Sequence, residues 1–128
     1  MTDISSISRA IALAAAEAAR DKQAADVVVL EVADLLSITD YFVICSTTSN
    51  RQSKTVIEAV EDRVRRELDL RPVRREGEAD AGWWLLDYVD VVVHVFGEEE
   101  RAYYDLERLW SDAPRPAWAA AGAARSVG

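Results

Sequence analysis

Three aspartates are the residues of this chain best suited to metal-dependent chemistry. Asp40 precedes one apolar run, and Asp87 and Asp90 bracket the break between two others. Carboxylates brought together can hold divalent cations for nucleotidyl transfer. Aspartate is equally ordinary at turns and strand starts, and the segment STTSNRQ (46–52) has neither paired glycines nor a Walker lysine. The signal for this chemistry is weak. A metal-dependent nucleotidyltransferase-like enzyme that uses these three aspartates is therefore kept only as an alternative to the binding function considered below.

Two further side chains carry reactive groups. His94, the single histidine, lies within VVVHVF (91–96), where a general base and a hydrogen-bonded structural histidine both fit the pattern. Cys45, the single cysteine, lies within YFVICS (41–46). A thiol in the middle of an apolar strand usually behaves as a small, inert hydrophobic group. No local motif pairs a cysteine or serine nucleophile with His94.

Three aromatic residues indicate a binding surface instead. Trp83, Trp84 and Tyr88 fall within WWLLDYVD (83–90), beside two acids. Strand alternation sends neighbouring tryptophans to opposite faces of a sheet, so we expect one indole at or near the surface. Exposed aromatic side chains beside acids at a hairpin tip are typical of interface hot spots. The alternative, that both tryptophans fill the core or its rim, remains open.

A β-hairpin is the element expected to position these residues. Two runs rich in β-branched and aromatic residues span 83–96 and are separated by residues 87–90, which predicts two antiparallel strands joined by a short turn. Further strands are expected at 26–32 and 41–46, with a short edge strand at 73–75 and a flexible acidic loop at 76–82. The three valines of the 26–32 strand predict burial on both of its faces.

Three helices are expected around these strands. Ser5 or Ser6 can cap a first helix that reaches about Arg20, and Ser49 followed by Gln52 forms a capping-box pattern for a second. The second helix continues to about residue 69, with ion pairs between Glu61 and Arg65 and between Asp62 and Arg66. The last helix opens at the glutamates of residues 98–100 and has an apolar face of Tyr103, Leu106, Leu109 and Trp110.

This order of elements predicts a single α/β domain over residues 1–112, with a mixed sheet of about five strands and flanking helices. Residues 113–128 are rich in alanine, proline and glycine, which predicts a poorly ordered tail. The chain's net charge of -8 argues against direct nucleic-acid binding. It favours a basic protein partner, although solubility alone also explains it. One cysteine and no apolar run near the ~20 residues of a membrane span predict a cytoplasmic protein.

Four sequence blocks carry a resemblance to a known family. They are SITDYFVICSTTSNRQ (37–52), EGE (76–78), WWLLDYVDVVVHVF (83–96) and ERAYYDLERLW (100–110). In this order and with these gaps they resemble the Iojap or ribosomal silencing factor family, over about residues 24–112. The resemblance implies an α/β domain shaped like nucleotidyltransferases but without their catalytic set.

The resemblance further implies a non-enzymatic translation regulator with no cofactor or metal. Such a protein binds large-subunit ribosomal protein fourteen, a basic protein, and sterically blocks joining of the small subunit, so that translation is repressed when nutrients are short. A homodimer is also implied as possible. These are expectations for the present chain.

The partner-contacting positions follow by matching the family's blocks. Trp83 and Tyr88 match contact positions, and Asp87 and Asp90 flank them. The family commonly has glycine where this chain has Val89 and Thr47. Glycine supplies the positive φ that a β-branched residue resists. Val89 therefore bears directly on the geometry of the turn that presents Tyr88, and Thr47 argues against a glycine-dependent ligand loop.

Overall fold

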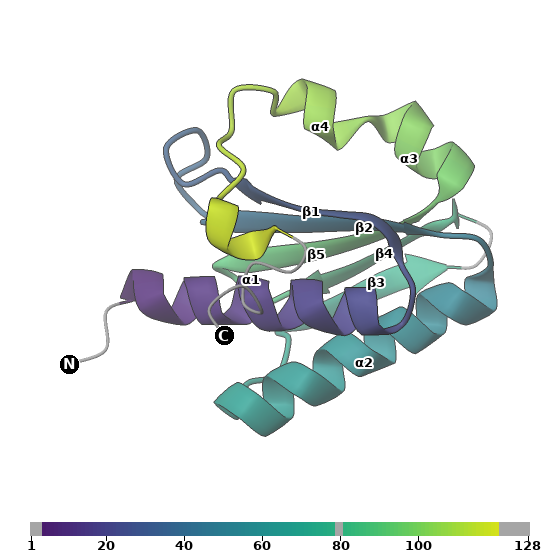
Figure 1. Cartoon of the computed structure of the whole chain (residues 1–128), viewed down its shortest axis with the longest axis horizontal. Coiled ribbons are helices and arrows are strands. Elements are labelled where there is room, and N and C mark those ends of the chain that lie inside the picture. Colours follow the sequence, from purple (N-terminus) through teal and green to yellow (C-terminus); the bar gives the residue numbers. More distant parts are fainter. Residues whose placement is uncertain (1–3, 79–80, 121–128) are drawn as a thin grey trace.

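The computed structural model describes residues 4–78 and 81–120, as one five-stranded sheet with helices on both faces (Figure 1). The helices are α1 (Ile4–Asp21), α2 (Asn50–Leu68), α3 (Glu98–Tyr104), α4 (Leu106–Leu109) and the 3₁₀ helix η2 (Ala117–Ala119). The strands are β1 (Ala25–Glu31), β2 (Tyr41–Thr47), β3 (Arg74–Glu78), β4 (Trp83–Asp87) and β5 (Val91–Gly97). Their spatial order is β1-β2-β5-β4-β3, with β2 parallel to β5 and the other neighbours antiparallel. The α/β fold class is confirmed.

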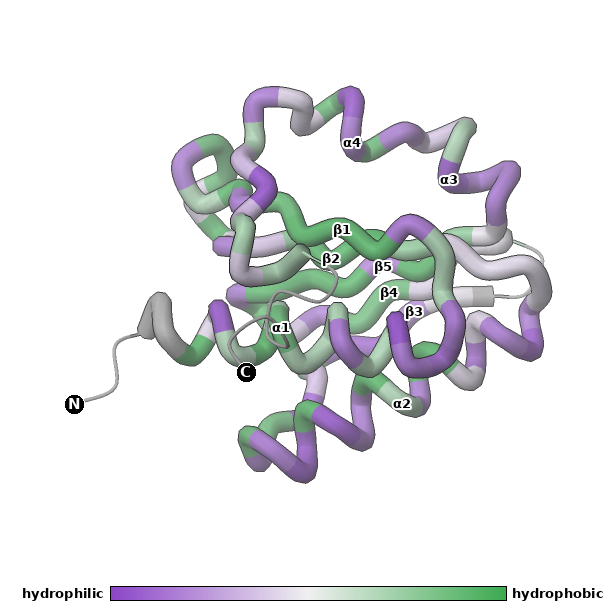
Figure 2. Tube along the Cα trace, viewed as in Figure 1, coloured by the Kyte–Doolittle hydropathy of each residue, from purple (hydrophilic) through white to green (hydrophobic). Residues whose placement is uncertain are grey.

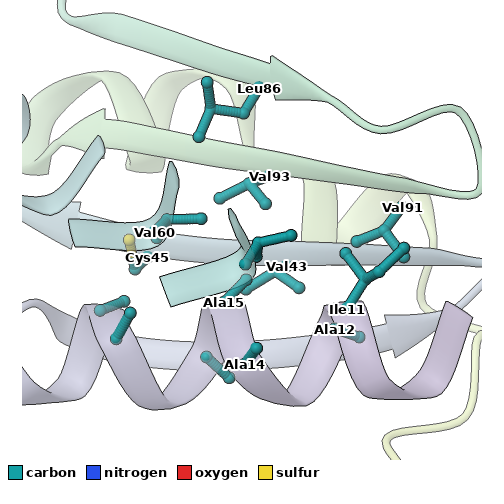
Figure 3. Packing of buried hydrophobic residues seen from close by; sticks show 14 of the residues in the cluster. Ile11, Ala12, Ala14, Ala15, Val43, Cys45, Val60, Leu86, Val91 and Val93 are labelled. Carbon is teal, nitrogen blue, oxygen red and sulfur yellow. The ribbon is translucent and has the colours of Figure 1, made fainter. Parts of the chain in front are cut away.

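Helices α1 and α2 cover one face of the sheet, which we call the helix-covered face. The alanines of α1 let its backbone approach closely, and Figure 3 shows Ile11 and Ala15 packed beside Val43 and Val91 of the sheet. Helix α1 begins at Ile4, upstream of the predicted serine caps. The expected cap at Ser5 or Ser6 is therefore wrong, because both serines lie inside the helix.

The start of α2 is as the sequence predicts, whereas its ion pairs differ in part. The Ser49 hydroxyl accepts a hydrogen bond from the Gln52 amide at 3.0 Å. Asp62 pairs with Arg66 at 2.8 Å, as expected, and also with Arg65 at 2.9 Å. The predicted pair between Glu61 and Arg65 is absent from the described ion pairs, because Glu61 binds Arg75 of β3 at 2.8 Å.

Helices α3 and α4 lie over the other face, which we call the aromatic face. The single helix predicted here is interrupted at Asp105, whose backbone adopts a left-handed conformation with φ 45°. Leu106 and Trp110 pack against this face, whereas Tyr103 and Leu109 remain exposed. Figure 2 shows hydrophobic residues concentrated in β1, β2 and β5 and hydrophilic ones along α3. The predicted apolar face of the last helix is thus half correct.

Strand β1 forms one edge of the sheet, and the expected burial on both of its faces is only partly correct: Val29 and Leu30 are buried on opposite faces, whereas Val27 and Val28 stay partly exposed. The strand buried throughout is its neighbour β2. Residues 113–120 fold back along β1: the Glu31 amide donates to the Pro114 carbonyl at 2.8 Å, and Arg20 donates to the Ala119 carbonyl at 2.7 Å. The expected poor order therefore does not describe residues 113–120. Residues 121–128 of the expected tail lie outside the described residues.

Strand β3 forms the other edge. It spans Arg74–Glu78 rather than residues 73–75, so it takes in the first part of the expected acidic loop. The extension depends on Gly77, which has φ 146° and lies against the Trp84 ring, where a β-carbon would approach ring atoms to 2.7 Å. Residues 79–80 of that loop lie outside the described residues.

Candidate binding surface

The predicted hairpin is formed by β4 and β5. Its turn is closed by a hydrogen bond of 2.9 Å from the Tyr88 amide to the Val91 carbonyl. Across the pair, Trp83 lies opposite Phe96, Leu85 opposite His94, and Asp87 opposite Val92. Side chains alternate along a strand. Trp83, Leu85 and Asp87 therefore share the aromatic face, and all three are partly exposed.

Trp83 is held in place by an aromatic cluster. Its ring centroid lies 5.0 Å from that of Phe96 and 4.6 Å from that of Tyr104. Its indole Nε1–H donates a hydrogen bond of 3.2 Å to Nδ1 of His94. The indole is thus fixed by its neighbours while part of its surface stays accessible.

His94 is a buried, neutral residue in this cluster. Because its Nδ1 accepts from Trp83, the neutral ring carries its proton on Nε2. Nε2 is buried and has no hydrogen-bond partner within the described residues. Burial lowers the pKa of His94 to about 4. Of the two interpretations left open by the sequence, this geometry supports a structural histidine that orients Trp83.

Trp84 lies on the opposite face, as strand alternation predicts. It packs against the helix-covered core, and its indole Nε1 is buried without an acceptor within the described residues. Both tryptophans are half-buried, so neither is fully exposed. Of the two, Trp83 contacts helix α3 through Tyr104, and α3 has no buried residue.

Tyr88 is not the exposed aromatic that the sequence predicted. It shares the face of Trp84 and is only 7% exposed, within the core formed by α1 and α2. Burial, followed by the charge of Glu61, raises the pKa of its hydroxyl. The hydroxyl has no hydrogen-bond partner within the described residues. In this conformation Tyr88 is inaccessible to a partner.

The hairpin turn places Val89 in a left-handed conformation, with φ 73°. The Val89 amide donates to Oδ1 of Asp87 at 2.7 Å, and the Thr39 hydroxyl donates to the Val89 carbonyl. The Asp40 and Tyr41 amides donate to the Asp90 carbonyl at 2.8 and 3.1 Å. These bonds explain how a β-branched residue is held where glycine is preferred.

The three aspartates do not assemble as the alternative function requires. Oδ2 of Asp40 accepts from the Ser8 hydroxyl at 2.7 Å, and Oδ2 of Asp87 binds Arg74 at 3.3 Å. Among residues 4–78 and 81–120, no group of three or more histidine, cysteine, aspartate or glutamate side chains could hold a metal ion. Cys45 is fully buried, and burial raises the pKa of its thiol to about 12. The geometry gives nucleotidyl transfer no support.

The strand-to-helix turn after β2 also fits poorly with a phosphate-binding role. An open pocket of about 370 Å³ lies there, lined by Thr47, Ser49 and the three glutamates 98–100. The Thr47 hydroxyl is buried and shares a hydrogen bond with Ser53. A pocket with this many carboxylates repels anions.

No helix within the described part of the chain is long and apolar enough to cross a membrane.

Sequence reasoning missed three exposed apolar residues near the turn. Ile38, Val73 and Val89 are exposed, and the segments of Ile38 and Val73 are each hydrogen-bonded to the hairpin that carries Val89. All three lie in loops or turns, where no hydrophobic periodicity reveals their position. The one available signal was Val89, a β-branched residue inside a turn between two aspartates.

Comparisons with known proteins agree with this architecture. The family described as "Ribosomal silencing factor during starvation" matches residues 5–126. A ribosomal silencing factor of Bacillus subtilis is 41% identical over 100 residues, covering 78% of this chain and 84% of that protein. The mouse protein named "Mitochondrial assembly of ribosomal large subunit protein 1" is 33% identical, covering 72% of this chain and 41% of that protein.

A solved structure shows the same fold. The crystal structure of a Chromobacterium violaceum protein superposes with a TM-score of 0.74 at 33% identity, covering 93% of this chain and 94% of that one. The family match spans nearly the whole sequence. The chain therefore belongs to the ribosomal silencing factor family.

Proposed function

We propose that this protein binds the large ribosomal subunit through ribosomal protein fourteen and sterically blocks joining of the small subunit. Translation would then be repressed under nutrient limitation, without catalysis and without a cofactor. Membership of a family whose relatives are named ribosomal silencing factors carries this proposal. The mouse relative, named for large-subunit assembly, supports the choice of subunit.

The proposed contact uses the accessible part of the hairpin. Trp83 supplies an aromatic anchor on the aromatic face, and its rigid support by His94 and Phe96 limits the entropy lost on binding. Asp87 and Asp90 steer the acidic chain toward a basic protein. Tyr88 contributes from within, by fixing the turn to the core.

Ribosome binding is tested by co-sedimentation of the purified protein with isolated large and small subunits. We expect retention by large subunits and exclusion by small ones. In a joining assay, saturating protein should keep the two subunits apart. Equal retention by small subunits, or unchanged joining with the protein bound, would contradict the proposal.

The site is tested by comparing the two neighbouring tryptophans. Trp83→Ala should weaken large-subunit binding by about 2 kcal/mol, or roughly thirtyfold, because a desolvated aromatic anchor is lost. Trp84→Ala removes the same side chain from the opposite face and serves as the matched control. Equal losses in both variants would show that the effect is destabilisation rather than lost contact.

Self-association is a separate part of the proposal. A homodimer in the cytoplasm would compete with ribosome binding if it covered the hairpin. Sedimentation equilibrium over a range of protein concentrations measures it directly. A single species of 14.2 kDa at all concentrations would rule the dimer out.

A further inference from the structure

The outer edge of β1 is covered by a segment that follows it without forming a strand. Residues 113–120, which we call the strap, return from α4 toward α1 along this edge (Figure 1). The Glu31 amide, at the end of β1, donates to the Pro114 carbonyl. Near the start of the strand, Arg20 donates to the carbonyls of Ala119 at 2.7 Å and Val27 at 3.4 Å. Within the described residues, the strap therefore spans β1 with a single backbone hydrogen bond.

Two prolines explain why the strap does not become a sixth strand. Pro114 and Pro116 lack the amide hydrogen that a β-ladder requires, and the chain then turns into η2. An open pocket of about 290 Å³ remains between the strap and residues 27–29 of β1. Proline and charged residues are common means by which proteins protect the edge of a sheet from pairing with another chain. The strap has this composition.

The register of β1 shows which backbone groups face the strap. In an antiparallel pair, successive residues direct their N–H and C=O groups alternately toward the neighbouring strand and away from it. The Glu31 amide points away from β2, because it donates to Pro114. Val29, two residues earlier, therefore directs its N–H and C=O toward the strap, where neither finds a backbone partner. Val29 is only 3% exposed. The strap thus closes this edge without satisfying its hydrogen bonds.

The edge is complementary to a second copy of itself. In antiparallel pairing centred on Val29, the two Val29 residues exchange backbone hydrogen bonds, as a two-fold symmetric contact requires. Glu31 of the second copy then lies opposite Val27. There it approaches Arg20, which already donates to the Val27 carbonyl. Self-pairing therefore brings together opposite charges as well as unpaired backbone groups.

We propose that the outer edge of β1 is a strand-pairing surface for a second copy of this chain and that the strap holds it closed. The strap is anchored by Trp118, whose ring lies edge-on to Tyr41 at 5.5 Å and under the Arg9 guanidinium at 4.7 Å. This inference is independent of the proposed function. Strands β2 and β5 separate β1 from β4, a distance of about 14 Å at the usual strand spacing. Pairing through β1 therefore differs from a homodimer that covers the hairpin.

The test opens the strap in the full-length chain. Trp118→Ser combined with Ala119→Lys removes the anchor and places a second cation beside Arg20, at a position that is only 2% exposed. In sedimentation equilibrium, this opened protein should self-associate roughly tenfold more tightly than the wild type, or more. Trp118→Phe is the matched control. It keeps an aromatic anchor, so its self-association should equal that of the wild type.

Two valines distinguish strand pairing from aggregation of a destabilised protein. Val27→Lys, added to the opened protein, places a charge on the β1 edge and should return self-association to the wild-type level. Val73→Lys makes the same change at an exposed position beside the opposite edge of the sheet, and it should have no effect. Hydrogen exchange at the Val29 amide should slow in the opened protein as its concentration rises, because pairing gives this amide an acceptor.

Wild-type self-association of the opened protein would overturn the inference. Equal effects of Val27→Lys and Val73→Lys would also overturn it, since association would then not depend on β1. Exchange at Val29 that is independent of protein concentration would place the contact elsewhere and reject the pairing.

Discussion

The two faces of the sheet are built differently. The helix-covered face packs valines and alanines beneath α1 and α2, which are 18 and 19 residues long. The aromatic face lies beneath α3 and α4, which have 7 and 4 residues. No residue of these two helices is itself fully buried. It leaves Trp83, Leu85 and Val92 partly exposed. The first face secures the fold, and the second retains apolar surface that a partner can cover.

The difference also appears in the polar groups that each face buries. The aromatic face buries the imidazole of His94, which holds Trp83 by a hydrogen bond. The helix-covered face buries the Tyr88 hydroxyl and the Trp84 indole N–H, both without partners within the described residues. His94 thus positions a candidate contact residue, although its Nε2 is buried without a partner within the described residues, whereas the two groups on the helix-covered face position no such residue and are costs of packing large aromatic residues beneath helices.

The largest expected effect concerns His94 and pH. Its pKa is about 4 when folded, against 6.5 as its ordinary value, so the unfolded chain binds more protons between these values. The contribution of the neutral His94 to the free energy of unfolding is therefore fully present above pH 6.5 and is lost as the pH falls toward 4. Over this range the free energy of unfolding should fall by about 3 kcal/mol. Urea unfolding at several pH values measures it.

A matched variant isolates the contribution of His94. His94→Gln cannot titrate, so its stability should fall less steeply than that of the wild type between pH 6.5 and 4. Parallel pH profiles for the two proteins would show that His94 is not the titrating group. The two faces of the sheet would then not differ in their response to pH.

Overpacking the helix-covered face should have the next largest effect. Ala15 is fully buried between α1 and the sheet. Ala15→Leu should reduce the free energy of unfolding by about 2 kcal/mol, because three added carbons have no space. The control is Ala102→Leu on α3, where the side chain is exposed. Equal urea midpoints for these two variants would mean that the faces do not differ in packing tolerance.

Local signals in the sequence predicted much of this architecture. The hairpin boundaries follow from β-branched and aromatic residues around a short polar break, and the α2 start follows from the pairing of Ser49 with Gln52. Trp83 and Trp84 lie on opposite faces because alternation is a property of any strand. These features depend on neighbours within a few residues.

Features that depend on distant partners were not predictable in the same way. The burial of Tyr88 depends on which face of β4 receives α1 and α2. The order of residues 113–120 depends on contacts such as that of Arg20 with the Ala119 carbonyl, 99 residues apart. The apolar pattern of the last helix predicts one continuous helix, whereas the left-handed backbone of Asp105 divides it into two. The approach of the loop of Ile38 to the hairpin turn depends on the bond from the Thr39 hydroxyl to the Val89 carbonyl, 50 residues apart.

The smallest expected effect concerns the unpaired Tyr88 hydroxyl beneath the helices. Tyr88→Phe keeps the ring and removes a buried polar group, so the free energy of unfolding should rise by about 1 kcal/mol. Thermal or urea unfolding measures the change. Ribosome binding should stay at the wild-type level, because only the hydroxyl changes and the turn remains anchored by the same backbone bonds. Lower stability would mean that the hydroxyl has a partner, such as Glu61 or a buried water molecule. Weaker binding with unchanged stability would return Tyr88 to the contact surface, and the two faces would then share the task of recognition.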